Sequence, residues 1–149
     1  MLLKEVCVLD VACCPRDTSV LEAARMMRLH HTGDLVVVDD PRGDRVPVGI
    51  VTDRDIVLEV LGKELDPAKT TVSEVMSSRL VIAEVSEDTS EALERMRLHG
   101  VRRIPVVDKD GGVVGIVTLD DMLRLHAERA NALLEIVTKE QTREHRGRR

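Results

Sequence analysis

One short pattern that combines a hydroxyl with a carboxylate occurs twice in this chain of 149 residues. It reads GIVTDRD at residues 49–55 and GIVTLDD at residues 115–121, so each copy has the form Gly-Ile-Val-Thr-x-x-Asp. A carboxylate can accept hydrogen bonds from two neighbouring hydroxyl groups, and a helix that begins at the threonine offers free N–H groups and a positive dipole to an anion. The pattern therefore suits the binding of a polar ligand as well as a purely structural role.

The structural role is helix capping. Thr52 and Thr118 each end an apolar run, and Asp55 and Asp121 then stand in the first turn of the helix that follows. Such a cap stabilises a helix by roughly 0.5–1 kcal/mol, and Thr-x-x-Asp is a common sequence. Capping alone does not account for the duplication, nor for the glycine in each copy, where a backbone or a ligand can approach closely.

The pattern belongs to a longer internal repeat. Residues 22–40 match residues 91–109 at an offset of 69 (91 − 22), and the Gly-Ile-Val-Thr segments match at an offset of 66 (115 − 49). The difference of three residues falls in a loop rich in proline and glycine, where a duplicated unit tolerates insertion. We therefore expect a first repeat at 4–61, a linker at 62–71, a second repeat at 72–126 and a C-terminal helix extension with a basic tail at 127–149.

Each copy has the pattern of a β-α-β-β-α unit, because short apolar runs between turn residues predict strands and helical spacing predicts helices. The predicted strands are 8–14, 34–40 and 47–52 in the first copy and 79–85, 103–109 and 113–118 in the second. Helices are predicted at 17–31, 53–62, from 88 and over 119–137, with a helical turn at 71–76. One copy is too small to bury much surface, so we expect the two sheets to face each other and share one core.

Two helix starts carry their own signals. Ser19 and Glu22 have the spacing of a capping box, whereas Asp88 before Glu91 predicts a looser cap.

Composition weighs against several classes of function. The net charge of −5 gives no general attraction to nucleic acid or to anionic membranes, and the basic end, 143–149, is read as a solvated terminus. The chain has no Phe, Tyr or Trp on which single-stranded bases could stack. It has neither a signal peptide nor an apolar run of the roughly 18 residues that span a bilayer, so a cytoplasmic location is expected.

No catalytic or metal-binding constellation is found in the sequence. Cys7, Cys13 and Cys14 lack the Cys-x2-Cys spacing of a zinc site, and His30 and His99 at matched helix ends are interpreted as interface or capping residues. There is no nucleophile elbow, Walker A loop or His-Glu-x-x-His. We therefore expect no metal site and no enzymatic activity.

The two copies together resemble a tandem pair of cystathionine-β-synthase (CBS) domains, also called a Bateman module. The resemblance is carried by TSVLEAARMM, GDLVVVDD and GIVTDRD in the first copy and by VSEVMS and RLHGVRRIPVVDKDGGVVGIVTLDD in the second, and it covers about residues 4–126. It implies an α+β fold of two β-α-β-β-α repeats packed sheet to sheet with pseudo-two-fold symmetry. Because the pair nearly fills the chain, it also implies a stand-alone CBS-pair protein.

The resemblance further implies a ligand. Family members bind adenosine compounds (AMP, ADP, ATP, NAD or S-adenosylmethionine) in the cleft between the domains. The aspartate of the motif holds the ribose hydroxyls, which here means Asp55 and Asp121, and the threonine contacts ribose or phosphate, which means Thr52 and Thr118.

Further contacts follow from the same resemblance. The adenine is bracketed by backbone near residues 11–13 with 34–36 and near 81–83 with 103–105, which gives Cys13, Asp34, Ala83, Arg103 and Pro105 as candidate contacts. Arg54, Arg102 and Arg103 are candidates for phosphate binding, since guanidinium grips phosphate in bidentate fashion. The copies differ where Asp34 stands in place of Arg103, so we expect two unequal pockets.

The function expected from these features is that of a regulatory module, sensing energy or redox state. Adenosine-nucleotide binding would change its conformation and thereby act on a separate, unknown protein. A homodimer is expected, and the stripe of Leu123, Ala127, Ala130, Leu134 and Val137 on the last helix would either form that contact or cover the core. The alternative is a structural homodimerisation module without a physiological nucleotide.

Overall fold

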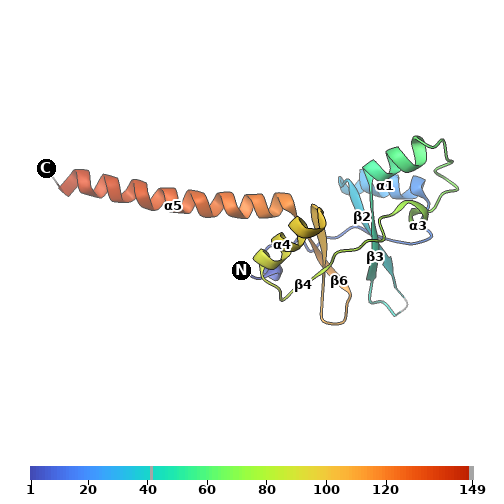
Figure 1. The fold of residues 1–149 in the computed structure, drawn as a ribbon, viewed down its shortest axis with the longest axis horizontal. Coiled ribbons are helices and arrows are strands. Elements are labelled where there is room, and N and C mark those ends of the chain that lie inside the picture. The colour runs from blue at the N-terminus through green and yellow to red at the C-terminus, as the bar shows by residue number, and fades with distance from the viewer. Residues whose placement is uncertain (41, 148–149) are drawn as a thin grey trace.

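Each sequence repeat forms its own three-stranded sheet (Figure 1). The computed structural model describes residues 1–40 and 42–147. The first sheet has the order β1-β2-β3 and the second the order β4-β5-β6. The strands are β1 (Cys13–Pro15), β2 (Asp34–Asp39), β3 (Val46–Thr52), β4 (Ala83–Glu84), β5 (Arg103–Val107) and β6 (Val113–Thr118). The predicted α+β class with two tandem repeats is confirmed.

The two sheets have the same pairing pattern. The first strand of each sheet pairs parallel with the second, which pairs antiparallel with the third. A register shift interrupts the antiparallel pair at matched places, Val37/Val38 and Val106/Val107. The central strands are nearly continuous apolar runs with both faces covered, as expected for strands buried on both sides. The outer strands β1 and β4 are shorter than the predicted 8–14 and 79–85.

The helices start and end largely at the expected signals. They are α1 (Val20–His30), α2 (Asp53–Asp55), α3 (Val72–Val75), α4 (Thr89–His99) and α5 (Leu119–Gly147), with a 3₁₀ turn η1 (Leu3–Glu5) and a π-helical segment η2 (Ile56–Leu61) that continues α2. α1 and α4 end in left-handed residues, His31 with φ 51° and Gly100 with φ 64°. The single helix predicted over 53–62 is thus split into α2 and η2, and η1 was not predicted.

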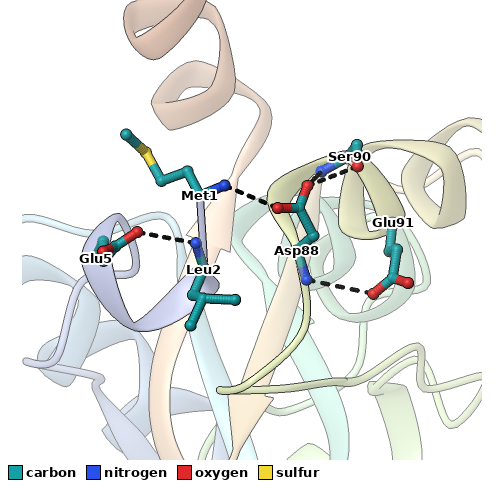
Figure 2. Close-up of polar contacts among 6 residues, drawn as sticks. All are labelled: Met1, Leu2, Glu5, Asp88, Ser90 and Glu91. Carbon is teal, nitrogen blue, oxygen red and sulfur yellow. Dashed lines mark hydrogen bonds and ion pairs between the residues drawn. The ribbon is translucent and has the colours of Figure 1, made fainter.

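The strengths of the two N-terminal caps are the reverse of the prediction. The Ser19 hydroxyl accepts from the Glu22 N–H, but the Glu22 side chain pairs with Arg25 and does not close the box. Asp88 forms the complete box with Glu91 and also accepts a hydrogen bond from the N-terminal ammonium of Met1 at 2.8 Å (Figure 2). This ammonium, which the prediction did not consider, lowers the pKa of Asp88 well below its usual value.

Three apolar clusters hold the molecule together in place of the single shared core that was expected. The first repeat is built around Leu35 and Val51 and the second around Ile104 and Val117, all fully buried. A third, smaller cluster lies between the sheets and contains the buried residues Val36, Val38, Val113 and Ile116. This cluster is the sheet-to-sheet contact, and it contains no aromatic residue.

The segment at the start of each repeat packs on the other repeat. We call residues 2–8 and 71–77 the crossing arms. Leu3 of the first arm is fully buried in the second core, and Val72 of the second arm is fully buried in the first core. The arms also add bridges to the opposite sheet, Val8 to Ile116 and Ser77 to Ile50. These contacts are pseudo-symmetric, because Val8 and Ser77 are 69 residues apart and Ile50 and Ile116 are 66 apart.

α5 leaves the body of the molecule soon after it begins (Figure 1). Only Met122 and Leu125 in this helix are buried, and every residue from 126 to 147 is exposed. The start of the helix packs on the second core through Met122, but the predicted stripe from Leu123 to Val137 is exposed and does not cover the core, which was one of its two predicted roles. No helix in the described residues is long and apolar enough to cross a membrane.

Candidate functional site

A cavity of about 440 Å³ lies between the two repeats, and we call it the first cavity. The first repeat supplies the end of β3 and the start of α2, and the second supplies the end of its crossing arm, the residues that follow it and the start of β5. Its lining residues are Ile50, Thr52, Asp53, Arg54 and Asp55 on one side and Ser77, Arg79, Leu80, Val81, Val101, Arg102 and Arg103 on the other. Five of the predicted site residues, Thr52, Arg54, Asp55, Arg102 and Arg103, thus meet at one place.

The first motif presents its carboxylate at this cavity through a helix cap. The Thr52 N–H donates to Asp55 Oδ2 at 2.9 Å, and the Asp55 N–H donates to Thr52 Oγ1 at 3.1 Å. This reciprocal capping box fixes both side chains at the first turn of α2, and both remain partly exposed. The carboxylate therefore keeps acceptor capacity for hydroxyl groups of a ligand.

The lining of the first cavity is positive on balance, because its four arginines outnumber its two aspartates, Asp53 and Asp55. Arg54 and Arg79 are exposed and form no ion pair with any described residue, and Arg102 approaches Asp120 only at 4.0 Å. Sequence reasoning missed Arg79, which lies outside any motif. The alignment of the two repeats could have drawn attention to it, because the offset of 69 pairs Arg79 with Asp10, a residue of opposite charge. The aliphatic side chains of Ile50, Leu80, Val81 and Val101 complete the wall against which a flat ring can lie.

A second cavity of only about 90 Å³ lies at the matching place in the first repeat. Its lining residues are Asp10, Val11, Ala12, His30, Thr32, Asp34 and Ile116. Offsets of 69 and 66 map all of these except His30 onto lining residues of the first cavity. The charge is reversed in this mapping, because Asp10 corresponds to Arg79 and Asp34 to Arg103. The two pockets are therefore unequal in size and in charge.

The carboxylate of the second motif, Asp121, interacts with other residues of the protein. Asp121 Oδ2 accepts from the Thr118 N–H at 2.9 Å and from the Thr118 hydroxyl at 2.7 Å. Asp121 Oδ1 pairs with Arg124 at 2.8 Å, and only 11% of the Asp121 side chain is exposed. Neither Thr118 nor Asp121 lines either cavity described above. The second copy of the pattern is thus a helix cap with both carboxylate oxygens in use.

The glycine of each motif makes room for a crossing arm. A Cβ on Gly49 would lie 2.5 Å from Met76 Sδ and 2.9 Å from the Ser77 carbonyl oxygen. A Cβ on Gly115 would meet Cys7 Sγ at 2.8 Å in the same way. The close approach that the sequence predicted is therefore an approach of the opposite arm.

Arg103 and Asp34, which occupy matched positions in the two repeats, face each other. Arg103 Nη1 lies 3.2 Å from Asp34 Oδ2, and the exposed fractions of the two side chains are 34% and 15%. Burial raises the pKa of Asp34, while Arg103 lowers it and Asp53 raises it further. The Nε atom of Arg103 is buried and has no hydrogen-bond acceptor among the described residues. One ion pair thus joins the linings of the two cavities.

The remaining predicted contacts lie outside both cavities. Cys13 packs in the cluster between the sheets, Ala83 is buried in the second core, and Pro105 is buried in β5. Burial raises the pKa of Cys14 to about 11, so that thiol stays protonated at neutral pH and is a poor nucleophile. No group of three or more potential metal-ligating side chains occurs in residues 1–40 and 42–147.

Comparison with known proteins identifies relatives across most of the chain. A family model for the CBS domain matches residues 3–62 and again residues 72–128. The protein MK0525 of Methanopyrus kandleri is 35% identical over 111 residues, which are 74% of this chain and 55% of that protein. The CBS domain-containing protein YhcV of Bacillus subtilis is 36% identical over 120 residues, 80% of this chain and 81% of YhcV. The chain thus spans about half the length of one relative and four fifths of the other.

A solved structure shares the arrangement of both repeats. The CBS domain pair of protein MJ0100, crystallised in complex with 5′-methylthioadenosine and S-adenosyl-L-methionine, superimposes with a TM-score of 0.75. It is 29% identical in sequence, and the match covers 87% of this chain and 98% of that one.

Proposed function

The chain belongs to the CBS-domain family, and from that premise we propose that it is a regulatory module that binds an adenosine nucleotide in the first cavity. Binding there bridges the two repeats and stabilises one arrangement of them, and a separate protein in the cytoplasm responds to the resulting surface. The module acts by binding and carries out no reaction of its own.

The first cavity is the observation that carries this proposal. Its aliphatic wall suits an adenine ring, and its capping-box carboxylate at Asp55 suits ribose hydroxyls. Arg54, Arg79 and Arg102 supply positive charge for phosphate oxygens. The adenosine compounds bound by the CBS pair of MJ0100 support the choice of an adenosine ligand.

Charge favours a phosphorylated ligand over a cationic one. The guanidinium groups at the first cavity attract phosphate and repel the positive charge of S-adenosylmethionine. The second cavity carries Asp10 and Asp34 at the corresponding positions and is far smaller. We therefore propose one anionic nucleotide per chain, with ATP or ADP preferred.

A thermal-shift panel with ATP, ADP, AMP, NAD and S-adenosylmethionine tests the proposal. A ligand at a hundred times its Kd raises the free energy of unfolding by about 2.7 kcal/mol, so it gives a clear rise in Tm. We expect the phosphorylated compounds to raise Tm and S-adenosylmethionine to have the smallest effect. A panel in which no adenosine compound raises Tm or binds in calorimetry would contradict nucleotide regulation.

The second candidate function, a homodimerisation module, is favoured by α5. The large residues of the stripe, Leu123, Leu134 and Val137, are exposed, Leu134 to 63%, on a helix whose last 22 residues (126 to 147) are all exposed. An apolar stripe of this kind is typical of a helix that packs against another helix. Self-association through α5 is compatible with nucleotide binding, because the helix projects away from the body (Figure 1).

A further inference from the structure

Among the four arginines of the first cavity, Arg103 is the one that pairs with a largely buried carboxylate. Its Nη1 lies 3.2 Å from Asp34 Oδ2, and Asp34 comes from the opposite repeat. Arg103 therefore serves two potential partners, the Asp34 carboxylate on one side and an anion in the first cavity on the other.

Asp34 depends strongly on this partner, because its other charged or titratable neighbours are mostly acidic. Asp53 at the start of α2 acts on it unfavourably, and Asp10 lines the second cavity beside it. His30, at the end of α1, lines the same cavity. Arg103 of β5 is the cation that lowers the pKa of Asp34, while burial raises that pKa. An anion that takes Arg103 out of this ion pair leaves Asp34 as a largely buried and unpaired carboxylate.

We propose that Asp34 positions Arg103 and competes with the bound anion for it, so that nucleotide binding in the first cavity is accompanied by proton uptake at Asp34. This inference rests on the proposed function, since it needs an anionic ligand in the first cavity. The bound phosphate takes over the Arg103 guanidinium, and the abandoned carboxylate relieves its unfavourable burial by taking a proton.

The sign of the linkage follows from the two states. Loss of the Arg103 charge raises the pKa of Asp34 in the bound protein above that in the free protein. Protons are therefore bound on complex formation, and the contribution of Asp34 favours binding as the pH falls towards the bound-state pKa. At higher pH the nucleotide must compete with the full charge of Asp34.

Titration calorimetry with ATP at about pH 6, in two buffers of different ionisation enthalpy, measures this proton uptake. The Asp34→Asn variant is expected to take up fewer protons than the wild type and to bind ATP about three- to tenfold more tightly, because the competitor is gone. The protonation of free ATP is the same in both titrations, so a difference in proton uptake arises within the complex. Asp10→Asn, which removes the other carboxylate of the second cavity, is the matched control and keeps wild-type proton uptake.

A second variant protects the test against misfolding of the first. Arg103→Met leaves Asp34 unpaired both before and after binding, so the Asp34 contribution to proton uptake must disappear while ATP affinity falls. If wild type and both variants bind ATP with equal proton uptake, the inference is wrong and the nucleotide site stands. If the wild type gives no ATP binding at all, both the inference and the proposed function are wrong.

Discussion

At the scale of single residues, the aspartates of the two motif copies differ in whether their carboxylates are available to a ligand. Asp55 keeps acceptor capacity at the edge of the first cavity, whereas both oxygens of Asp121 are occupied by Thr118 and Arg124. The sequence predicted the caps correctly as local structure, since Thr-x-x-Asp is a local signal. It could not separate the copies, because Arg124 and the cavity walls come from outside the motif.

Matched substitutions distinguish the two aspartates. Asp55→Ala and Asp121→Ala each remove a helix cap and are expected to lower stability by about 1 kcal/mol. Only Asp55→Ala also removes a ligand contact, so its ATP affinity should fall about tenfold or more while that of Asp121→Ala stays near wild type. Calorimetry and thermal melts of both variants decide this. Equal loss of affinity in both would mean that the second motif also binds ligand.

At the scale of elements, strands and long helices could be predicted because their periodicity is strong, and the helical turn predicted at 71–76 is confirmed as α3. The crossing of the two arms to the opposite repeat could not be predicted, because the arms are short and no periodic signal shows where they pack. Their function is visible only in three dimensions, where Leu3 and Val72 enter the opposite cores. Cap strength was misjudged for a similar reason, since the Met1 ammonium that reaches Asp88 is 87 residues away.

The caps of α1 and α4 should respond differently to pH. The pKa of Asp88 is lowered in the folded protein, chiefly by its hydrogen bond with the N-terminal ammonium, so its contribution to stability is present above the unfolded pKa and is lost as the pH falls. Asp88→Ala should therefore lower Tm clearly at about pH 7 and less at about pH 3. Ser19→Ala removes the matched but uncharged cap of α1 and should lower Tm by a similar amount at both pH values. A pH-independent loss in Asp88→Ala would rule out this charge effect.

At the scale of the whole molecule, the body and α5 are separable in function. The helix contributes buried residues only up to Leu125, so the two cores and the first cavity do not depend on its remainder. The sequence showed the apolar stripe on this helix, but not that the helix would stand clear of the sheets. That outcome depends on the cores being filled already by the crossing arms and by α1 and α4.

Removal of the exposed part of α5 should therefore change assembly and spare the nucleotide site. A chain that ends at residue 127 is expected to fold and to bind ATP as the full chain does. It is expected to be a monomer in solution, whereas the full chain is expected to be a dimer. Light scattering after gel filtration measures this. Leu134→Glu, within the stripe, should also give a monomer, and Ala132→Glu, on the opposite face, should leave the dimer intact. A dimer that survives truncation would place the contact elsewhere.

The pairing of Asp34 with Arg103 shows what joining two repeats in one chain makes possible. A separate repeat whose arm crossed to a second copy would be complete only as two identical copies around a two-fold axis. A residue near such an axis meets its own twin, so a charged residue there would face a like charge. Within one polypeptide the two matched positions can differ, and here one is acidic and the other basic. The repulsion that two identical repeats would suffer at this place is therefore replaced by an attractive ion pair.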